Sequence, residues 1–115
     1  MSSHPAKVSA RKRERQRLLR ELSGLTRLIH GSFFERFSTC GRPTCACHQG
    51  QRHGPRGYLT IKEGRRQRQF YVPQSQTDAV RDGIQQYHRL RELVERISSI
   101  NLELMQGGTL DEPDS

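Results

Sequence analysis

All three cysteines of the chain lie within eight residues, in the stretch CGRPTCAC at positions 40–47. Cys40, Cys45 and Cys47 follow the pattern C-x4-C-x-C, and His48 and His53 come soon after them. A structural zinc site uses four ligands in a tetrahedron, usually cysteine thiolates with up to two histidines. The residue types and their spacing therefore predict a zinc ion held by Cys40, Cys45, Cys47 and His53.

His48 remains the alternative fourth ligand. We favour His53 because Gly54-Pro55 restricts the backbone beside it, whereas His48 follows Cys47 directly and would need a tighter turn. Four protein ligands leave no open position for a substrate, so the predicted zinc is structural and not catalytic. Two further interpretations stay open, a redox pair formed by Cys45 and Cys47 and a loop of ordinary residues.

The composition gives such an ion a physical role. The chain has 115 residues, of which 31% are hydrophobic, and it has no tryptophan. Globular domains usually contain roughly 45–50% apolar residues, so this chain can bury only a thin core. Small cores of this kind usually need a metal, a disulfide or a partner subunit. A zinc ion that stabilises the fold is consistent with this requirement.

The sequence predicts a cytoplasmic protein with no membrane segment. Its amino-terminal stretch lacks an apolar run of signal-peptide length, and no stretch is apolar enough to span a bilayer. Thiols stay reduced in the cytoplasm, where clustered cysteines are more often metal ligands than disulfides. An odd number of cysteines also argues against a closed disulfide framework.

The segments on either side of the cysteines predict the elements that position them. Residues 1–10 are expected to be a disordered tail and residues 11–30 a basic amphipathic helix, with Leu18, Leu22, Leu25 and Ile29 on one stripe. Residues 31–73 are expected to form a zinc-loop β-meander. It would contain a strand at 32–38, the cysteine loop, and a hairpin of strands 58–62 and 66–72.

A long helix is expected at residues 74–106, before an acidic disordered tail at 107–115. Val80, Tyr87, Val94 and Asn101 recur at intervals of seven, and a second heptad position runs parallel to them. This pattern is typical of a coiled coil and predicts a homodimer through the carboxy-terminal helix. The expected fold class is α+β: a small three-stranded antiparallel meander with a zinc-binding loop, flanked by an amino-terminal helix and a long coiled-coil-like helix.

The positive charge predicts a nucleic-acid partner, DNA or RNA. The chain has 20 Lys and Arg against 12 Asp and Glu, a net charge of +8, and the excess lies in residues 1–73. Such a surface attracts polyanions. Tyr58, Phe70 and Tyr71 could stack on bases, although sheet core is the alternative. The candidate cations, which could equally form a solvated face, are Arg11, Lys12, Arg13, Arg15, Arg17, Arg42, Arg52, Arg56, Lys62, Arg65, Arg66 and Arg68.

Nothing in the sequence predicts an enzyme. The carboxylates are scattered and lie mostly in the last helix, and the chain has no nucleophile elbow and no phosphate-binding glycine loop.

Residues 31–105 carry a resemblance to a known group of proteins. The stretches CGRPTCAC, HGPRGYLTI, EGR and FYVP, followed by a long helix, resemble a family of small bacterial and archaeal domains with a C-G-x-P-x-C-x-C…H-G-P core. Members are often encoded beside or within transposons. The resemblance implies that Cys40, Cys45, Cys47 and His53-Gly54-Pro55 define the family, and that the chain is a transposition accessory or regulator.

Taken together, these observations predict a non-enzymatic, zinc-stabilised nucleic-acid-binding protein that regulates or assists a mobile element. The competing hypothesis is a protein-interaction module whose long helix binds a transposase or another partner without contacting nucleic acid. Salt dependence separates the two, because phosphate contacts weaken steeply as the salt concentration rises.

Overall fold

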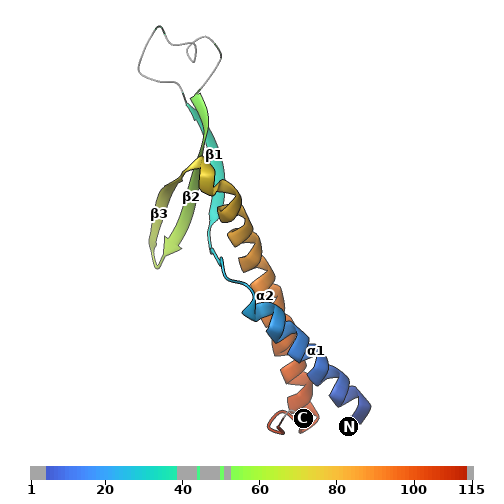
Figure 1. Ribbon diagram of the computed structural model, residues 1–115. Coiled ribbons are helices and arrows are strands. Elements are labelled where there is room, and N and C mark those ends of the chain that lie inside the picture. Colours follow the sequence, from blue (N-terminus) through green and yellow to red (C-terminus); the bar gives the residue numbers. More distant parts are fainter. Residues whose placement is uncertain (1–4, 39–43, 45–49, 51–52, 114–115) are drawn as a thin grey trace. The chain divides into compact units, whose positions relative to one another are not determined.

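The computed structural model describes residues 5–38, 44, 50 and 53–113. Its elements follow the order α1, β1, β2, β3, a short 3₁₀ turn and α2 (Figure 1). The chain divides into two compact units. Residues 1–26 and 86–115 form one, here called the helical unit, and residues 27–85 form the other, the sheet unit. The long helix α2 contributes its first turns to the sheet unit and the rest to the helical unit.

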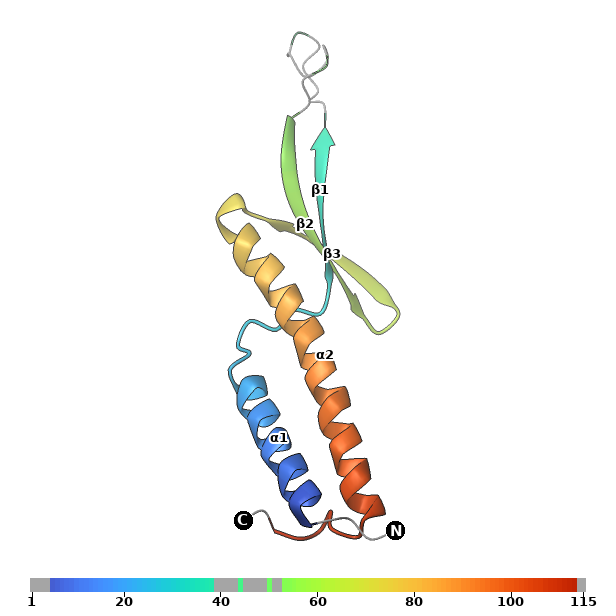
Figure 2. The ribbon, with the colours of Figure 1, turned by 90° about the vertical axis from the view of Figure 1, so that its right-hand side faces the viewer.

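The helical unit is an antiparallel pair of helices. Helix α1 (Pro5–Ser23) lies alongside the later turns of α2 (Thr77–Gln106), as Figure 2 shows. The unit's core is small: Leu93, Ile100 and Leu104 are 1%, 0% and 2% exposed. These residues recur at spacings of seven and four, so they lie on one face of α2. Burying these aliphatic side chains is the main favourable term for the unit.

The first helix begins and ends earlier than the predicted range of 11–30. It begins at Pro5, a residue tolerated in a first turn because it needs no hydrogen-bond acceptor there, so residues 5–10 are helical and not a disordered tail. After Ser23 the backbone tightens, with the N–H of Gly24 donating to Glu21 and that of Leu25 to Leu22. The leucine stripe therefore continues past the helix into extended chain.

The second helix confirms the long predicted helix and buries Leu104 of the second predicted heptad position, but it does not bury the position of Val80, Tyr87, Val94 and Asn101. Val94, on the predicted heptad seam, is 47% exposed, whereas Leu93 and Ile100, one residue before Val94 and Asn101, are fully buried. The helix ends in a Schellman motif, because the N–H of Thr109 donates to Leu104 and the N–H of Gly108 to Met105. Gly108 has φ 74°, a conformation that glycine adopts without strain. Turns continue through the described part of the predicted disordered tail.

The sheet unit contains a three-stranded antiparallel sheet in the order β1-β2-β3. The strands are β1 (Ser32–Ser38), β2 (His53–Glu63) and β3 (Arg66–Val72). The antiparallel meander predicted from the sequence is thus confirmed, with β2 starting five residues earlier than predicted. A two-residue turn, Gly64-Arg65, joins β2 to β3, and Glu63 pairs with Arg66 across it.

Proline in a strand is usually confined to an edge or a bulge, and Pro55 follows this rule. The β2–β3 pairing begins only at Gly57, so at Pro55 the strand has β1 as its single described neighbour. The β1–β2 register shifts between Arg36 and Ser38, next to this position. The Gly54-Pro55 pair, predicted to lie in a loop, therefore lies in the first residues of a strand.

The two faces of the sheet differ in what covers them. The face that carries Phe33 and Glu35 of β1, here called the inner face, contacts Arg81 of α2; the opposite face is called the outer face. The Arg81 guanidinium carbon lies 4.5 Å from the Phe33 ring centre, and Arg81 Nη2 lies 2.6 Å from Glu35 Oε1. Gly57 lets the Phe33 ring lie close to β2, because a Cβ on it would lie 2.8 Å from that ring and would force the ring to move. Val72, 5% exposed, is the buried apolar residue of this unit among the described residues.

Candidate nucleic-acid interface

A row of three aromatic rings crosses the outer face of the sheet, one from each strand. Phe34 pairs with Tyr58, and Tyr58 pairs with Tyr71, so the three side chains share a face. The rings of Phe34 and Tyr58 are stacked with centres 5.5 Å apart, and those of Tyr58 and Tyr71 meet edge to face at 6.1 Å. We call Phe34, Tyr58 and Tyr71 the aromatic row.

The row's rings are held at different depths. Phe34 and Tyr58 are half-buried, whereas Tyr71 on the edge strand is 59% exposed. The guanidinium carbon of Arg36 lies 5.5 Å from the ring centres of both Phe34 and Tyr58. This arrangement is a cation–π contact that fixes the arginine beside the row. Tyr71 is therefore the ring of the row that is most open to a planar base, whereas the guanidinium of Arg36 lies at the rings of Phe34 and Tyr58.

The outer face carries cations without carboxylates. Arg56 pairs with Arg36 on the neighbouring strand, and Lys62 lies on the same face of β2. All three are exposed. Alternation along the strands places on this face Ser32, Phe34, Arg36, Arg56, Tyr58, Thr60, Lys62, Gln67, Gln69 and Tyr71, none of them acidic.

The inner face has the opposite character. Its strand residues include Glu35 and Glu63, and both carboxylates are paired, with Arg81 at 2.6 Å and Arg68 at 2.9 Å. Arg66 and Arg68 lie on this face, so the hairpin cations expected to form one patch are divided between two faces. Phe70 is also on the inner face, where its ring centre is 4.7 Å from the Arg68 guanidinium carbon. Arg65 is exposed in the turn.

In the helical unit, several of the predicted cations contact other parts of the protein. Arg15 is only 9% exposed and donates to the Asn101 side-chain carbonyl at 2.7 Å. Arg11 bonds to Glu103 at 2.9 Å and to Glu14 at 3.3 Å, and Lys12 reaches the Pro113 carbonyl at 3.4 Å. Arg13 and Arg17 are exposed. The first helix thus presents fewer cations to a ligand than its sequence suggests.

Carboxylate pKa values reflect this pairing. A hydrogen bond from Arg96 lowers the pKa of Glu14, and one from Arg89 lowers the pKa of Glu21. The same contacts raise the pKa of Arg96 and that of Arg89. The bond from Arg96 Nη2 to Glu14 Oε1 is 2.9 Å long, as is that from Arg89 Nη2 to Glu21 Oε1. Helix-to-helix ion pairs therefore occupy these guanidinium groups.

The predicted zinc ligands are not tested by the structure. Cys40, Cys45, Cys47 and the alternative ligand His48 lie outside the described residues, as do Arg42 and Arg52. His53 is described in its backbone alone, which pairs with Ser38 across β1 and β2. Elsewhere in the described chain, no group of three or more His, Cys, Asp or Glu side chains is placed to hold a metal.

Sequence reasoning missed two members of this interface, Phe34 and Arg36. The run Phe33-Phe34-Glu35-Arg36-Phe37 alternates imperfectly, so it does not reveal which aromatic residue shares a face with Arg36. The signal that could have identified them is the pairing of this strand with Tyr58-Leu59-Thr60. In that register Ser32, Phe34 and Arg36 lie opposite Thr60, Tyr58 and Arg56 and share their face of the sheet.

The molecule is thus an α+β protein in which two units share one long helix and one sheet face is basic and aromatic. A family model described as a domain of unknown function, DUF6788, matches residues 9–82, more than half of the chain, and the protein belongs to that family. The matched range includes all three strands and the cysteine segment. No curated protein and no solved structure matches the chain. Within the described residues, no helix is long and apolar enough to cross a membrane.

Proposed function

We propose that the protein binds single-stranded nucleic acid, DNA or RNA, on the outer face of its sheet and performs no catalysis. The observation that carries the proposal is the aromatic row bordered by Arg36, Arg56 and Lys62 on a face without carboxylates. Proteins that bind single strands combine rings on which bases stack with cations that follow the phosphates. Aromatic rings on a sheet face can stack on the unstacked bases of a single strand, which the bases of a duplex do not allow.

The proposal assigns different roles to the three rings. Tyr71 is exposed enough to stack on a base, whereas Tyr58 contacts Tyr71 edge to face, and Phe34 and Tyr58 contact Arg36. Arg56 and Lys62 would meet phosphates on either side of the row. Each such contact releases counterions from the nucleic acid, so binding weakens as salt is added.

Measuring binding at several salt concentrations tests this assignment. A labelled oligonucleotide of about twelve residues, close to the site size of single-strand-binding folds, would be titrated by fluorescence anisotropy from about 50 to about 200 mM salt. We expect Arg56→Ala to weaken binding and to reduce the slope of log affinity against log salt by about 0.7. Arg66→Ala, on the inner face, is the matched control and should leave the slope unchanged. Equal effects of the two substitutions would refute the outer face as the site.

We further propose that zinc, held by Cys40, Cys45, Cys47 and His53, stabilises the end of the sheet. The pairing of Ser38 with His53 supports this, because it joins the two ends of the fourteen-residue stretch at positions 39–52. Cys40 follows Ser38 by two residues, so covalent geometry alone keeps the Cα atoms of Cys40 and His53 within about 13 Å. A metal ion would offset the entropy lost when this stretch is closed.

Metal analysis of protein purified without added metal tests the zinc proposal. We expect one zinc per chain and its loss in Cys45→Ser, with Thr44→Ser, its neighbour, as the control. Because metal binding contributes to folding, Cys45→Ser should also lower the thermal midpoint. A comparison of His53→Ala with His48→Ala then identifies the fourth ligand. Metal-free wild-type protein with three reactive thiols would contradict the proposal.

A role as regulator or accessory factor of a mobile element rests on the resemblance of the cysteine segment alone. It predicts that the preferred nucleic acid is found at transposon ends or in a transposase transcript. Sequencing the nucleic acid that co-purifies with the full chain tests this role, and recovery of unrelated sequences alone would contradict it.

The second candidate function is a protein-interaction module built on α2. Val94, Leu102 and Met105 of this helix are 47%, 53% and 51% exposed and could contact a partner. Of these side chains, Val94 belongs to the heptad position through which the homodimer is predicted. Sedimentation at rising salt separates the two functions, because apolar helix contacts persist where phosphate contacts weaken. A monomer at every concentration would count against the dimer.

A further inference from the structure

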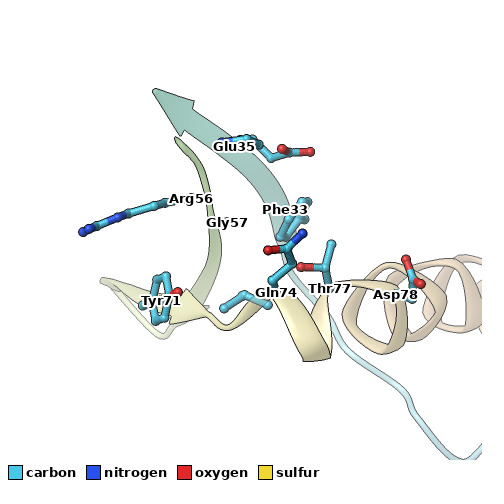
Figure 3. A pocket seen from close by; sticks show the side chains of 10 residues that line it. Phe33, Glu35, Arg56, Gly57, Tyr71, Gln74, Thr77 and Asp78 are labelled. Atoms are coloured by element: carbon cyan, nitrogen blue, oxygen red, sulfur yellow. The ribbon is translucent and has the colours of Figure 1, made fainter. Parts of the chain in front are cut away.

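A hollow of about 250 Å³ opens where β3 stops and β2 continues without it. The Phe33 ring and Gly57 form part of its lining, and the polar side chains of Gln74, Thr77 and Asp78 stand around it (Figure 3). These three residues come from the 3₁₀ turn and the first turn of α2. Its volume is below the range of about 300–1,000 Å³ that is usual for pockets binding drug-sized ligands, so one small ring system suits it best.

The same hollow borders the outer face. Tyr71 and Arg56 line it as well, and Figure 3 shows their side chains directed to the opposite side of the strands from Phe33, Gln74 and Thr77. Tyr71 also belongs to the aromatic row, and Arg56 is one of the cations beside it. A strand lying along the outer face would therefore pass the rim of the hollow.

The chemistry of the lining suits a nucleobase better than a phosphate. Asp78 and Glu35 are carboxylates at the hollow, and they would repel an anion despite the adjacent helix start. An aromatic ring, an amide, a hydroxyl and carboxylates together match a flat heterocycle with hydrogen-bonding edges. Glu35 is already paired with Arg81. The hydrogen-bond acceptors that can discriminate between bases are therefore the side-chain oxygens of Asp78 and Gln74.

We infer that this hollow holds one base turned out of the bound strand and selects bases that carry an exocyclic amino group over thymine and uracil. The inference rests on the proposed function, since it names the specificity of the same site. Cytosine presents an N4 amino donor where thymine presents the O4 acceptor. At that position a carboxylate such as Asp78 accepts a hydrogen bond from the cytosine amino group but is repelled by the thymine O4.

The test compares oligodeoxycytidylate with oligodeoxythymidylate of the same length, about twelve residues, at neutral pH. Both are pyrimidine strands, so their backbones and stacking areas are alike. We expect the wild-type protein to prefer the cytosine strand by about fivefold, the lower end of what one base contact contributes. Asp78→Ala and Gln74→Ala should each reduce that preference without changing the affinity for the thymine strand.

Asp82→Ala, one turn further along α2 and outside the hollow, is the matched control and should keep the full preference. Equal wild-type affinities for the two strands, or a preference that survives both Asp78→Ala and Gln74→Ala, would overturn the inference and leave the proposed function standing. Failure of both strands to bind would overturn the proposed function and the inference with it.

Discussion

The arginines of the helical unit and those of the outer sheet face have different partners. In the helical unit the arginines pair with carboxylates across the helices, as Arg96 does with Glu14 and Arg89 with Glu21. On the outer face of the sheet, Arg36 instead lies beside two aromatic rings. Paired guanidinium groups hold the protein's own helices together, whereas cations on a face without carboxylates remain able to meet phosphates. Position in the fold, more than total charge, therefore separates structural arginines from candidate ligand contacts.

The core of the helical unit provides the largest expected effect. Ile100→Ala should destabilise the protein by about 2–5 kcal/mol, because a fully buried aliphatic side chain is lost and a cavity remains. Urea denaturation followed by circular dichroism measures this. Leu102→Ala, two residues away and 53% exposed, is the control and should change stability by less than about 0.5 kcal/mol. Similar losses in both variants would show that the buried stripe is assigned to the wrong face of α2.

Arg15 provides the next test. Its place in a basic stretch of the sequence predicts phosphate binding, whereas its contacts in the structure indicate a role in stabilising the fold. Arg15→Ala removes the donor to Asn101 and should cost about 1–3 kcal/mol of stability, the usual penalty for a deleted hydrogen bond that leaves its partner unpaired. Under conditions where the variant stays folded, its affinity for nucleic acid should match that of the wild type. Exposed Arg13→Ala should affect stability little. A large loss of binding with unchanged stability would reverse the assignment of Arg15.

Acid should weaken the helix-to-helix ion pairs, with a smaller effect on stability than the substitutions above. The folded-state pKa values of Glu14 and Glu21 are lowered by Arg96 and Arg89, so their stabilisation is fully present above the ordinary value of 4.5. It is lost as the pH falls from there through the lowered values. The thermal midpoint should therefore decline below about pH 4.5, and less steeply in a Glu14→Gln, Glu21→Gln double variant. An identical decline in that variant would rule out these pairs as the cause.

Much of the architecture could be predicted from sequence because it depends on local patterns. The 3.6-residue periodicity of α2 and the Glu63-Gly64-Arg65 turn between apolar runs are visible without tertiary information. The start of α1 was missed because residues 5–10 contain none of the leucines that mark the predicted stripe. Its end was missed because the leucine stripe continues beyond Ser23 in chain that is not helical.

Which residues share a face of the sheet could not be predicted without the register of the strands. Alternation separates Arg56 and Lys62 from Arg66 and Arg68 only after Glu63 is known to pair with Arg66. The burial of Arg15 was not predictable, since a charged residue on a helix is usually solvated and its partner Asn101 lies 86 residues away. Asn101, a member of the predicted heptad position, accepts a hydrogen bond from Arg15 within the same chain.

The central claim is that the protein binds single-stranded nucleic acid on the outer face of the sheet, and not on the inner face, with an aromatic ring stacked on a base. The most direct test compares Tyr71→Ala with Phe70→Ala, neighbouring exposed aromatic residues of β3 that lie on opposite faces. In titrations with a labelled single-stranded oligonucleotide, Tyr71→Ala should weaken the binding free energy by about 1–3 kcal/mol, the contribution of one stacked base. Phe70→Ala should leave the binding free energy unchanged. Wild-type affinity in Tyr71→Ala, or an equal loss in Phe70→Ala, would contradict the claim.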